Sequence, residues 1–517
     1  MRRIGIDVGG TNTDAVLLDG SAVTVSVKRP TTEDVTGGIL DALAAVRADP
    51  AGGGSIDAVV IGTTHFINAV VQRRDLVPTA AIRIGLPASA SLPPFCDWPA
   101  DLAAIANGGI FGIEGGHDVD GRPYMPLDTG ALKAAARAIA SAGIGAVAVT
   151  SSFSPMDPSC EETAAEILAE LCPGVAVTLS HTLGRIGLLE RENAALLNAS
   201  LNGLATHTVA SFRDAIARSG IDAPLYITQN DGTVVGADLA VRFPVMSFAS
   251  GATNSMRGAA YLSGLDEAMV VDVGGTTSDI GQLRNGFPRE ANAVVEVGGV
   301  RTLFRMPDLL SIGLGGGSHV TGEPPVVGPV SVGFRLPQEA LVFGGQRLTA
   351  TDIAVAAGLI DIGDKAAVAH LPAGLVTGAL ANARRQIEDA VDRMKTGAGN
   401  VPLVAVGGGA MLVPDRLAGV SDIIHVKDGD CANAVGAAIA MVSGEADQVF
   451  TGMTREEAVA AAVRIAEERA VEAGAARESL ATLEVEDMPL AYLPGDALRV
   501  RVRTAGDLAI ASGAAAS

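Results

Sequence analysis

The sequence is poor in aromatic residues and lacks long apolar runs. Phe, Trp and Tyr make up 3% of the 517 residues, with a single Trp, whereas 63 residues are Gly. A chain in which small residues replace aromatic ones favours helices packed closely on sheets. No stretch reaches the roughly 18 consecutive apolar residues that a membrane-spanning helix needs. We therefore expect no contact with a membrane.

Positive charge is also scarce. Lys and Arg number 37 against 58 Asp and Glu, which gives a formal net charge of −21. Proteins that bind nucleic acids present basic surfaces to the phosphate backbone, so this balance argues against a nucleic-acid partner. Any phosphate group must be bound locally, by a metal ion and backbone N–H groups.

Several common chemical motifs are missing. The four cysteines are scattered without CxxC spacing, which excludes a zinc knuckle and a disulfide framework. GxxxxGK[ST] and GxSxG do not occur, so a Walker-type P-loop is excluded and a serine hydrolase is unsupported. The chain opens on residues typical of a strand, with no apolar signal core, and we expect a cytoplasmic location.

Helical and strand patterns alternate along the chain, which predicts an α/β fold. The start reads as three strands, a helix and a fourth strand. Segments 86–125 and 303–345 are rich in turn residues and predict loops. Residues 185–218 predict one long helical stretch, 454–474 a helix with a capping box at Thr454 and Glu457, and 482–504 short strands.

One octapeptide occurs twice. DVGGTNTD at Asp7–Asp14 returns 265 residues later as DVGGTTSD at Asp272–Asp279, with six of eight positions identical. In both copies an apolar strand precedes the glycines and another strand follows. A repeated motif in a repeated context predicts an internally duplicated fold.

Each copy has the composition of a phosphate-binding hairpin. Glycines let a phosphate approach the backbone closely, and N–H groups and hydroxyls can then surround it. Asp7 and Asp272 stand at strand ends, where they can hold Mg²⁺ through water or position a nucleophile. An ordinary pair of glycine hairpins is the alternative. The candidate ligands for the nucleotide are Gly9, Gly10, Thr11, Asn12, Thr13, Gly274, Gly275, Thr276 and Thr277.

Two further glycine-rich segments are candidate nucleotide contacts. A strand runs into Gly407, Gly408 and Gly409, where a ribose or an adenine could rest on exposed backbone. Gly315 and Gly316 belong to GLGGGS at 313–318, which could line the triphosphate. A turn between a strand and a helix explains the first segment equally well, and a mobile loop explains the second.

Three histidines are candidates for chemistry. His65 follows a strand and begins a helix, and His181 lies at the end of a strand, where α/β sheets place ligands. We assign both a catalytic role, with Asp7 and Asp272. His117, in the polar loop GGHDVDG, is a candidate metal ligand. A hydrogen-bonded surface histidine is the alternative for His65, and an Asx-type turn is the alternative for His117.

Together these motifs resemble the hydantoinase A/oxoprolinase family, within the superfamily that contains actin, hexokinase and the heat-shock chaperone ATPases. The resemblance covers most of residues 1–440, in order. It rests on GGTNTD at 9–14, GTTHFINA at 62–69, GGHDVDG at 115–121, TQNDGT at 228–233, DVGGTTSD at 272–279 and IGLGGGS at 312–318.

The resemblance implies a duplicated actin-like (ribonuclease H-like) ATPase fold, with two lobes around a nucleotide cleft. It assigns an N-terminal lobe to 1–195, with an insertion at about 86–125, a second lobe to 196–450, and a C-terminal helix with a small β tail to 451–517. The family's longer members extend further, so the chain corresponds to a short variant.

The resemblance also implies ATP and Mg²⁺, or another divalent metal, as cofactors. The expected activity is ATP-dependent hydrolysis of a cyclic amide such as a hydantoin or 5-oxoproline, by phosphorylation of its carbonyl oxygen. A B-type hydantoinase subunit is the expected partner, and a homo-oligomer is compatible with this reading. Departures from the family pattern fall at Asn12, Ala252 and Leu310.

Two other classes of function stay open. One is a small-molecule kinase or a ketone carboxylase subunit on the same fold. The other is an interaction protein that is switched by ATP and turns over no small molecule. Product analysis with lactams, hydantoins and ketones separates them.

Overall fold

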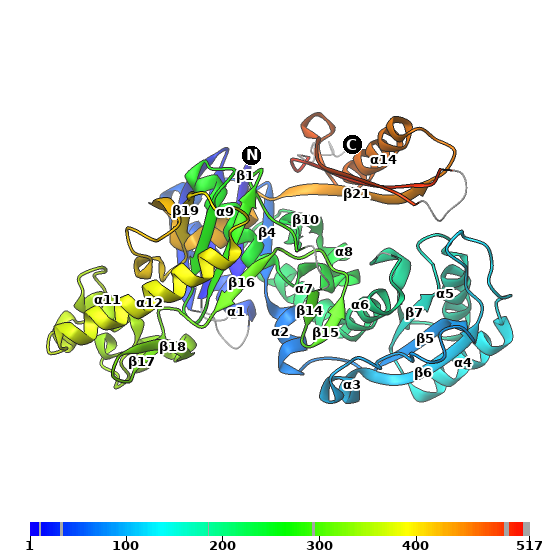
Figure 1. Cartoon of the computed structure of the whole chain (residues 1–517), viewed down its shortest axis with the longest axis horizontal. Helices are drawn as coiled ribbons and strands as arrows, with labels where there is room; N and C mark the ends of the chain where they lie inside the picture. The colour runs from blue at the N-terminus through cyan, green and yellow to red at the C-terminus, as the bar shows by residue number, and fades with distance from the viewer. Residues whose placement is uncertain (10–11, 31–34, 185, 292–294, 491–495, 510–517) are drawn as a thin grey trace.

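Three sheets organise the computed structural model, which describes residues 1–9, 12–30, 35–184, 186–291, 295–490 and 496–509 (Figure 1). Gly10 and Thr11 of the first hairpin lie outside these residues. The first sheet has nine strands, in the order β22 (Ala481–Pro489), β23 (Leu498–Gly506), β21 (Met441–Phe450), β10 (Thr233–Gly236), β9 (Leu225–Thr228), β4 (Ala58–Thr63), β1 (Arg2–Val8), β2 (Asn12–Asp19) and β3 (Ala22–Pro30).

The second sheet repeats the plan of the first. It runs β13 (Phe287–Pro288), β12 (Ser278–Arg284), β11 (Met269–Val273), β19 (Val401–Val406) and β20 (Val420–His425), with β16 (Leu309–Ile312) also paired to β12. In both sheets an antiparallel hairpin, β1–β2 or β11–β12, continues into a parallel neighbour, β4 or β19. This shared plan accounts for the duplicated motif.

The third sheet is a separate parallel unit, drawn at the opposite side of Figure 1 from β1 and β19. Its order is β6 (Asn107–Glu114), β5 (Thr79–Leu86), β7 (Ala146–Ser151) and β8 (Ala176–Leu179). Segment 86–125, expected to form loops, therefore contains a strand, and α3 (Ala100–Ala106) precedes it. The glycines of GGIFG at 108–112 concealed the strand, whose formation depends on its pairing with β5.

The helices cover these sheets, and two short ladders complete the regular structure. The predicted stretch 185–218 divides into α6 (Leu188–Ser200) and α7 (Asn202–Arg218) on either side of Leu201. The capping box of Thr454 and Glu457 is confirmed at the start of α14 (Arg455–Glu472). The remaining elements are α1 (Val35–Ala48), α2 (His65–Gln72), α4 (Thr129–Ala142), α5 (Ser159–Leu171), α8 (Ala237–Arg242), α9 (Ser250–Ser263), α10 (Leu336–Glu339), α11 (Ala350–Ala356), α12 (Ala373–Met394), α13 (Ala432–Ala438), β14 (Val295–Val297) with β15 (Val300–Thr302), and β17 (Ser318–Thr321) with β18 (Val326–Ser331).

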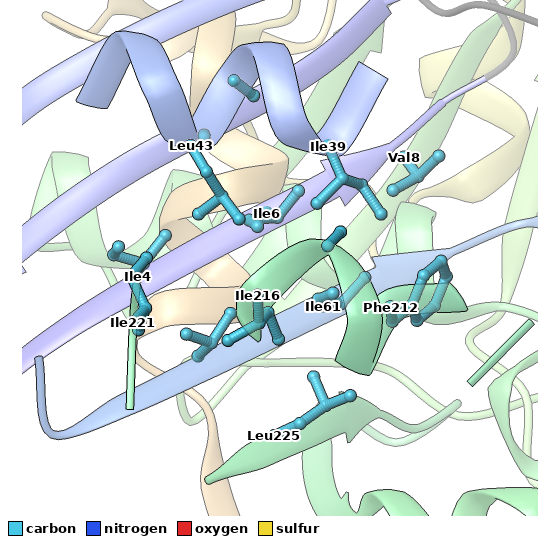
Figure 2. Packing of buried hydrophobic residues seen from close by; sticks show 14 of the residues in the cluster. Ile4, Ile6, Val8, Ile39, Leu43, Ile61, Phe212, Ile216, Ile221 and Leu225 are labelled. Carbon is cyan, nitrogen blue, oxygen red and sulfur yellow. The ribbon is translucent and has the colours of Figure 1, made fainter. Parts of the chain in front are cut away.

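One face of the first sheet carries the core shown in Figure 2. Side chains alternate across a strand, so Ile4, Ile6 and Val8 of β1 share one face and pack under α1 and α7. Ile39 of α1 and Phe212 of α7 are fully buried there. This core fixes the end of β1, where Asp7 stands.

Two helices made of small residues lie between the first and second sheets. α13 packs on β1, β2 and β4, while α9 packs on β11, β12 and β19. A Cβ atom at Gly258 of α9 would lie 1.9 Å from the carbonyl oxygen of Ala432, and one at Gly436 would lie 1.8 Å from that of Asn254. Glycine at both positions lets the helices cross closely and brings the two hairpins near enough for the charge of Asp272 to act on Asp7. We call the region between the hairpins the cleft.

The C-terminal strands extend the first sheet. β21 pairs in parallel with β10, and β23 lies between β21 and β22, each of the last two nine residues long. The sequence predicts short strands for 482–504, whereas this segment contributes to two strands of nine residues each. The nine-stranded sheet thus draws strands from all three predicted segments, 1–195, 196–450 and 451–517. In the described part of the chain, no helix combines the length and apolarity needed to cross a bilayer.

Candidate functional site

The described parts of the two hairpins match in their pairing. In the first, the N–H of Gly9 donates to the carbonyl of Asn12 at 3.0 Å, and in the second Gly274 donates to Thr277 at 2.9 Å. Asp7 faces Asp14 across its ladder, as Asp272 faces Asp279. The duplicated sequence therefore forms a duplicated arrangement, with a pair of carboxylates beside each glycine turn.

Asp7 is almost fully enclosed, with 5% exposure. Its Oδ2 accepts a hydrogen bond from Nδ2 of Asn433 at 3.1 Å, while its buried Oδ1 has no partner among the described residues. Burial and the nearby Asp14 raise the pKa of Asp7 to about 7, against the effect of the Asn433 bond. A buried carboxylate oxygen without a protein donor is available to bind a cation or water.

Asp272 is held in a matching setting. Burial, with a smaller contribution from the charge of Asp279, raises the pKa of its carboxyl to about 6, against the opposing effect of the nearby Ser255 hydroxyl. Gly407, with φ +87°, lies against it: a Cβ there would be 2.2 Å from Oδ1 of Asp272. The predicted glycine segment 407–409 therefore meets the second hairpin.

The two aspartates belong to one electrostatic environment. The charge of Asp272 helps to raise the pKa of Asp7, and Lys28 lowers the pKa of both. Lys28 lies opposite Asp14 in the β2–β3 ladder and forms an ion pair with it at 2.6 Å. Four carboxylates and one lysine leave this cleft with excess negative charge, which a divalent cation would neutralise.

Glycine loops support the second hairpin. Gly316 and Gly317 donate to the carbonyls of Gly274 and Gly275 at 3.0 and 2.7 Å, and Gly315 packs on Gly275 and Thr276. Gly315 and Gly316 are buried, so they hold the hairpin in shape. Thr276, Thr277 and Gly408 are exposed and form the part of this site that a ligand can contact.

His65 lies beside the first hairpin. It begins α2, and its side chain lines a cavity of about 260 Å³ together with Val8, Gly9 and Asn68. Burial lowers the pKa of His65, which favours a neutral imidazole at neutral pH. The structure thus places His65 beside Val8 and Gly9, the two residues that follow Asp7.

His117 and His181 do not join this cleft, because both stand on the four-stranded unit. Nδ1 of His181 lies 2.8 Å from the buried Glu161, and Nε2 of His117 lies 3.6 Å from Asp157. Among the described residues, no three His, Cys, Asp or Glu side chains group closely enough to hold a metal ion. A catalytic role for His181 and a metal role for His117 stay predictions.

Sequence reasoning missed Asn433 and Lys28 as parts of the site. Asn433 is 426 residues from Asp7 and carries no local signal. Lys28 could have been found by continuing the hairpin register from Asp14 into β3. Among the departures from the family pattern, Leu310 pairs with Ile280 and packs against the apolar core of the second sheet, so it makes an apolar packing contact.

The residues present fit Mg²⁺. This ion keeps several waters and is commonly bound by one or two carboxylates together with phosphate oxygens. Asp7 and Asp272 supply such carboxylates, and Oδ1 of Asp7, which no described donor contacts, can act as a ligand atom.

Comparisons with known sequences point to one family. The hydantoinase/oxoprolinase N-terminal region matches residues 3–172, and the hydantoinase/oxoprolinase domain matches residues 191–364. Caprolactamase subunit alpha of Pseudomonas jessenii is 27% identical over 392 residues, 69% of this chain and 54% of the relative. The acetophenone carboxylase gamma subunit of Aromatoleum aromaticum is 28% identical over 394 residues, 69% of this chain and 53% of the relative. The chain spans about half the length of these curated relatives.

Solved structures confirm the fold. The ATP-dependent caprolactamase of Pseudomonas jessenii superposes with a TM-score of 0.77 at 20% identity, covering 97% of this chain and 87% of that one. Nucleotide-free acetone carboxylase gives 0.67 at 16% identity, covering 99% and 89%. The predicted α/β class and duplicated actin-like ATPase fold are confirmed. With both of its family regions matched in order, the chain belongs to the hydantoinase/oxoprolinase family.

Proposed function

We propose that the chain binds ATP with Mg²⁺ between its two hairpins and transfers the γ-phosphoryl group to the carbonyl oxygen of a cyclic amide. The observation that carries this proposal is the pair of matching hairpins, each with a carboxylate of raised pKa at the end of its first strand. The caprolactamase likeness supports ATP and a cyclic amide as the reactants.

The chain's own residues supply positioning and charge. Asp7 and Asp272 hold the metal or its waters, while the hydroxyls of Thr276 and Thr277 and the hairpin N–H groups donate to phosphate oxygens. Bound Mg²⁺ supplies neutralisation of the phosphate charge. Phosphoryl transfer depends mainly on such alignment and charge compensation.

The proposed reaction balances without another cofactor. The amide oxygen bonds to the γ-phosphorus as the bond to the β–γ bridging oxygen breaks, ADP leaves, and the amide proton passes to water. Water then attacks the imidate carbon, the C–N bond breaks with protonation of nitrogen, and a second water hydrolyses the acyl phosphate. The products are an amino acid, ADP and phosphate.

A ketone is the second candidate substrate. The likeness to the acetophenone carboxylase gamma subunit favours it, since an enolate oxygen presents the same kind of nucleophile to the γ-phosphate. Both curated relatives are named as subunits, so we also propose a B-type partner subunit.

The test is ADP release from MgATP with hydantoin, 5-oxoproline, 2-pyrrolidinone and acetophenone, without and with a candidate partner. We expect ADP release that depends on one amide, with the ring-opened acid as product: an amino acid from a lactam, or an N-carbamoyl amino acid from hydantoin. Asp272→Asn should lower this rate at least about 100-fold, since one charged ligand of the transferring group is lost. Asp415→Asn, at an exposed position, is the control. ADP release that Asp272→Asn leaves intact would overturn the assignment of the site.

A further inference from the structure

The cavity beside the first hairpin is lined by one face of α2. His65, Asn68, Ala69 and Gln72 follow the spacing i, i+3, i+4, i+7, which places them on one side of a helix. Val8 and Gly9 of the first hairpin also line the cavity. Its volume of about 260 Å³ is below the ~300–1,000 Å³ of sites for drug-sized ligands, so it suits a small molecule.

This cavity adjoins the proposed phosphoryl-transfer site. Asp7 pairs with Gly62 in the β1–β4 ladder, two residues before Thr64, the N-cap of α2. A Cβ at Gly251 would lie 3.3 Å from Cγ2 of Thr64 and 3.8 Å from Oδ1 of Asp7. The residues that line the cavity and the carboxylate of Asp7 therefore share neighbours. Such proximity is needed if a phosphoryl acceptor in the cavity is to lie beside the γ-phosphate.

The side chains that α2 contributes to the cavity are mostly polar and uncharged. Burial lowers the pKa of His65, which favours its neutral form at neutral pH. Asn68 and Gln72 carry uncharged amides. The charged residues of the lining, Arg74 and Asp75, are exposed and of opposite sign. A neutral polar ligand fits this lining better than an anion does.

Asn68 offers an amide edge that is only partly used. Its Nδ2 donates to Oγ1 of Thr64 at 3.2 Å, and its Oδ1 makes no hydrogen bond within the described part of the chain. A primary amide presents a C=O and an N–H side by side. A lactam or hydantoin ring holds its amide cis, so its N–H and C=O also point the same way and can pair with both groups. An open-chain secondary amide is trans and can make only one of these bonds.

We propose that Asn68 recognises the cis-amide edge of the substrate and makes the enzyme selective for cyclic over open-chain amides. This inference rests on the proposed function and adds its specificity-determining residue. One lone pair of the substrate oxygen accepts from Nδ2, which leaves the other free to meet the γ-phosphate.

The experiment measures amide-dependent ADP release by the full chain with any required partner, using 2-pyrrolidinone and hydantoin as cis amides and N-methylacetamide as the trans amide. Asn68→Asp removes the donor, and Asn68→Leu removes both groups at similar size. We expect KM for the cis amide to rise about tenfold or more in both, with the preference over N-methylacetamide reduced. Val71→Ala, at an exposed position of the same helix, should keep the wild-type KM.

The thermal shift on adding MgATP separates the ways this can fail. A shift retained in both Asn68 variants, with raised KM, supports the proposal, and the second variant covers a failure of the first to fold. Unchanged KM and selectivity overturn the role of Asn68 while the proposed function stands. A wild-type protein that shifts with MgATP but turns over no amide overturns both.

Discussion

At the scale of single residues, the site depends on two carboxylates that the fold places where their charged form is disfavoured. Asp7 and Asp272 both have pKa values raised by burial, and each lies beside glycines that leave room for its oxygens. Asp7 and Asp272 could be predicted from the motif, because the strand end and glycine turn are local. Asn433 could not, since only the packing of α13 on β1 brings it there.

Gly407 tests this crowding. Gly407→Ala places a Cβ in left-handed backbone and against the Asp272 carboxylate, so we expect a loss of MgATP binding and ~1–3 kcal/mol of stability. Gly397→Ala is the matched control, because no atom lies within 4 Å of the added carbon. Titration calorimetry and thermal melting give the two readouts. Equal behaviour of the variants would contradict the arrangement.

Glu161 gives a prediction for pH. Although burial raises its pKa, hydrogen bonds from His181, Ser154 and Ser180 outweigh this and lower the pKa overall. A carboxyl with a depressed folded pKa adds stability above its unfolded value, about 4.3, and this is lost as pH falls through the folded value. Wild type should therefore exceed Glu161→Gln in free energy of unfolding at neutral pH, and this stability difference should shrink below about pH 4. Denaturant unfolding at pH 7 and at lower pH measures it, and a constant difference would contradict it.

At the scale of elements, the crossing of α9 and α13 joins the two halves. Helix propensity predicts that replacing a helical glycine by alanine stabilises by up to ~1 kcal/mol. Gly258 and Gly436 are exceptions, since the partner backbone fills the space a Cβ needs. Composition alone does not explain a glycine inside a helix. Only the contact between α9 and α13 explains why Gly258 and Gly436 are glycines.

Gly258→Ala should therefore lower the free energy of unfolding by about 2 kcal/mol or more, as expected for overpacking, and Tm should fall with it. Gly374→Ala in α12, where the added carbon meets nothing within 4 Å, should be neutral or slightly stabilising. Thermal unfolding compares them. A neutral Gly258→Ala would show that the helices are not in close contact.

At the scale of the whole molecule, the duplication was readable from the sequence but the course of the first sheet was not. The hairpins, the α/β alternation and the family motifs are local patterns. The pairing of β21 with β10 joins residues about 200 positions apart, and β6 forms from a glycine-rich segment because β5 offers it a partner. Strand pairing of this kind depends on context more than on composition.

The most direct measurement is calorimetric titration with a non-hydrolysable ATP analogue, with and without Mg²⁺. If the two hairpins form one site, wild type binds one nucleotide per chain, Mg²⁺ tightens the binding, and Asp7→Asn and Asp272→Asn each remove that tightening. Two nucleotides per chain, or an undiminished effect of Mg²⁺ in either variant, would show that the hairpins do not act together.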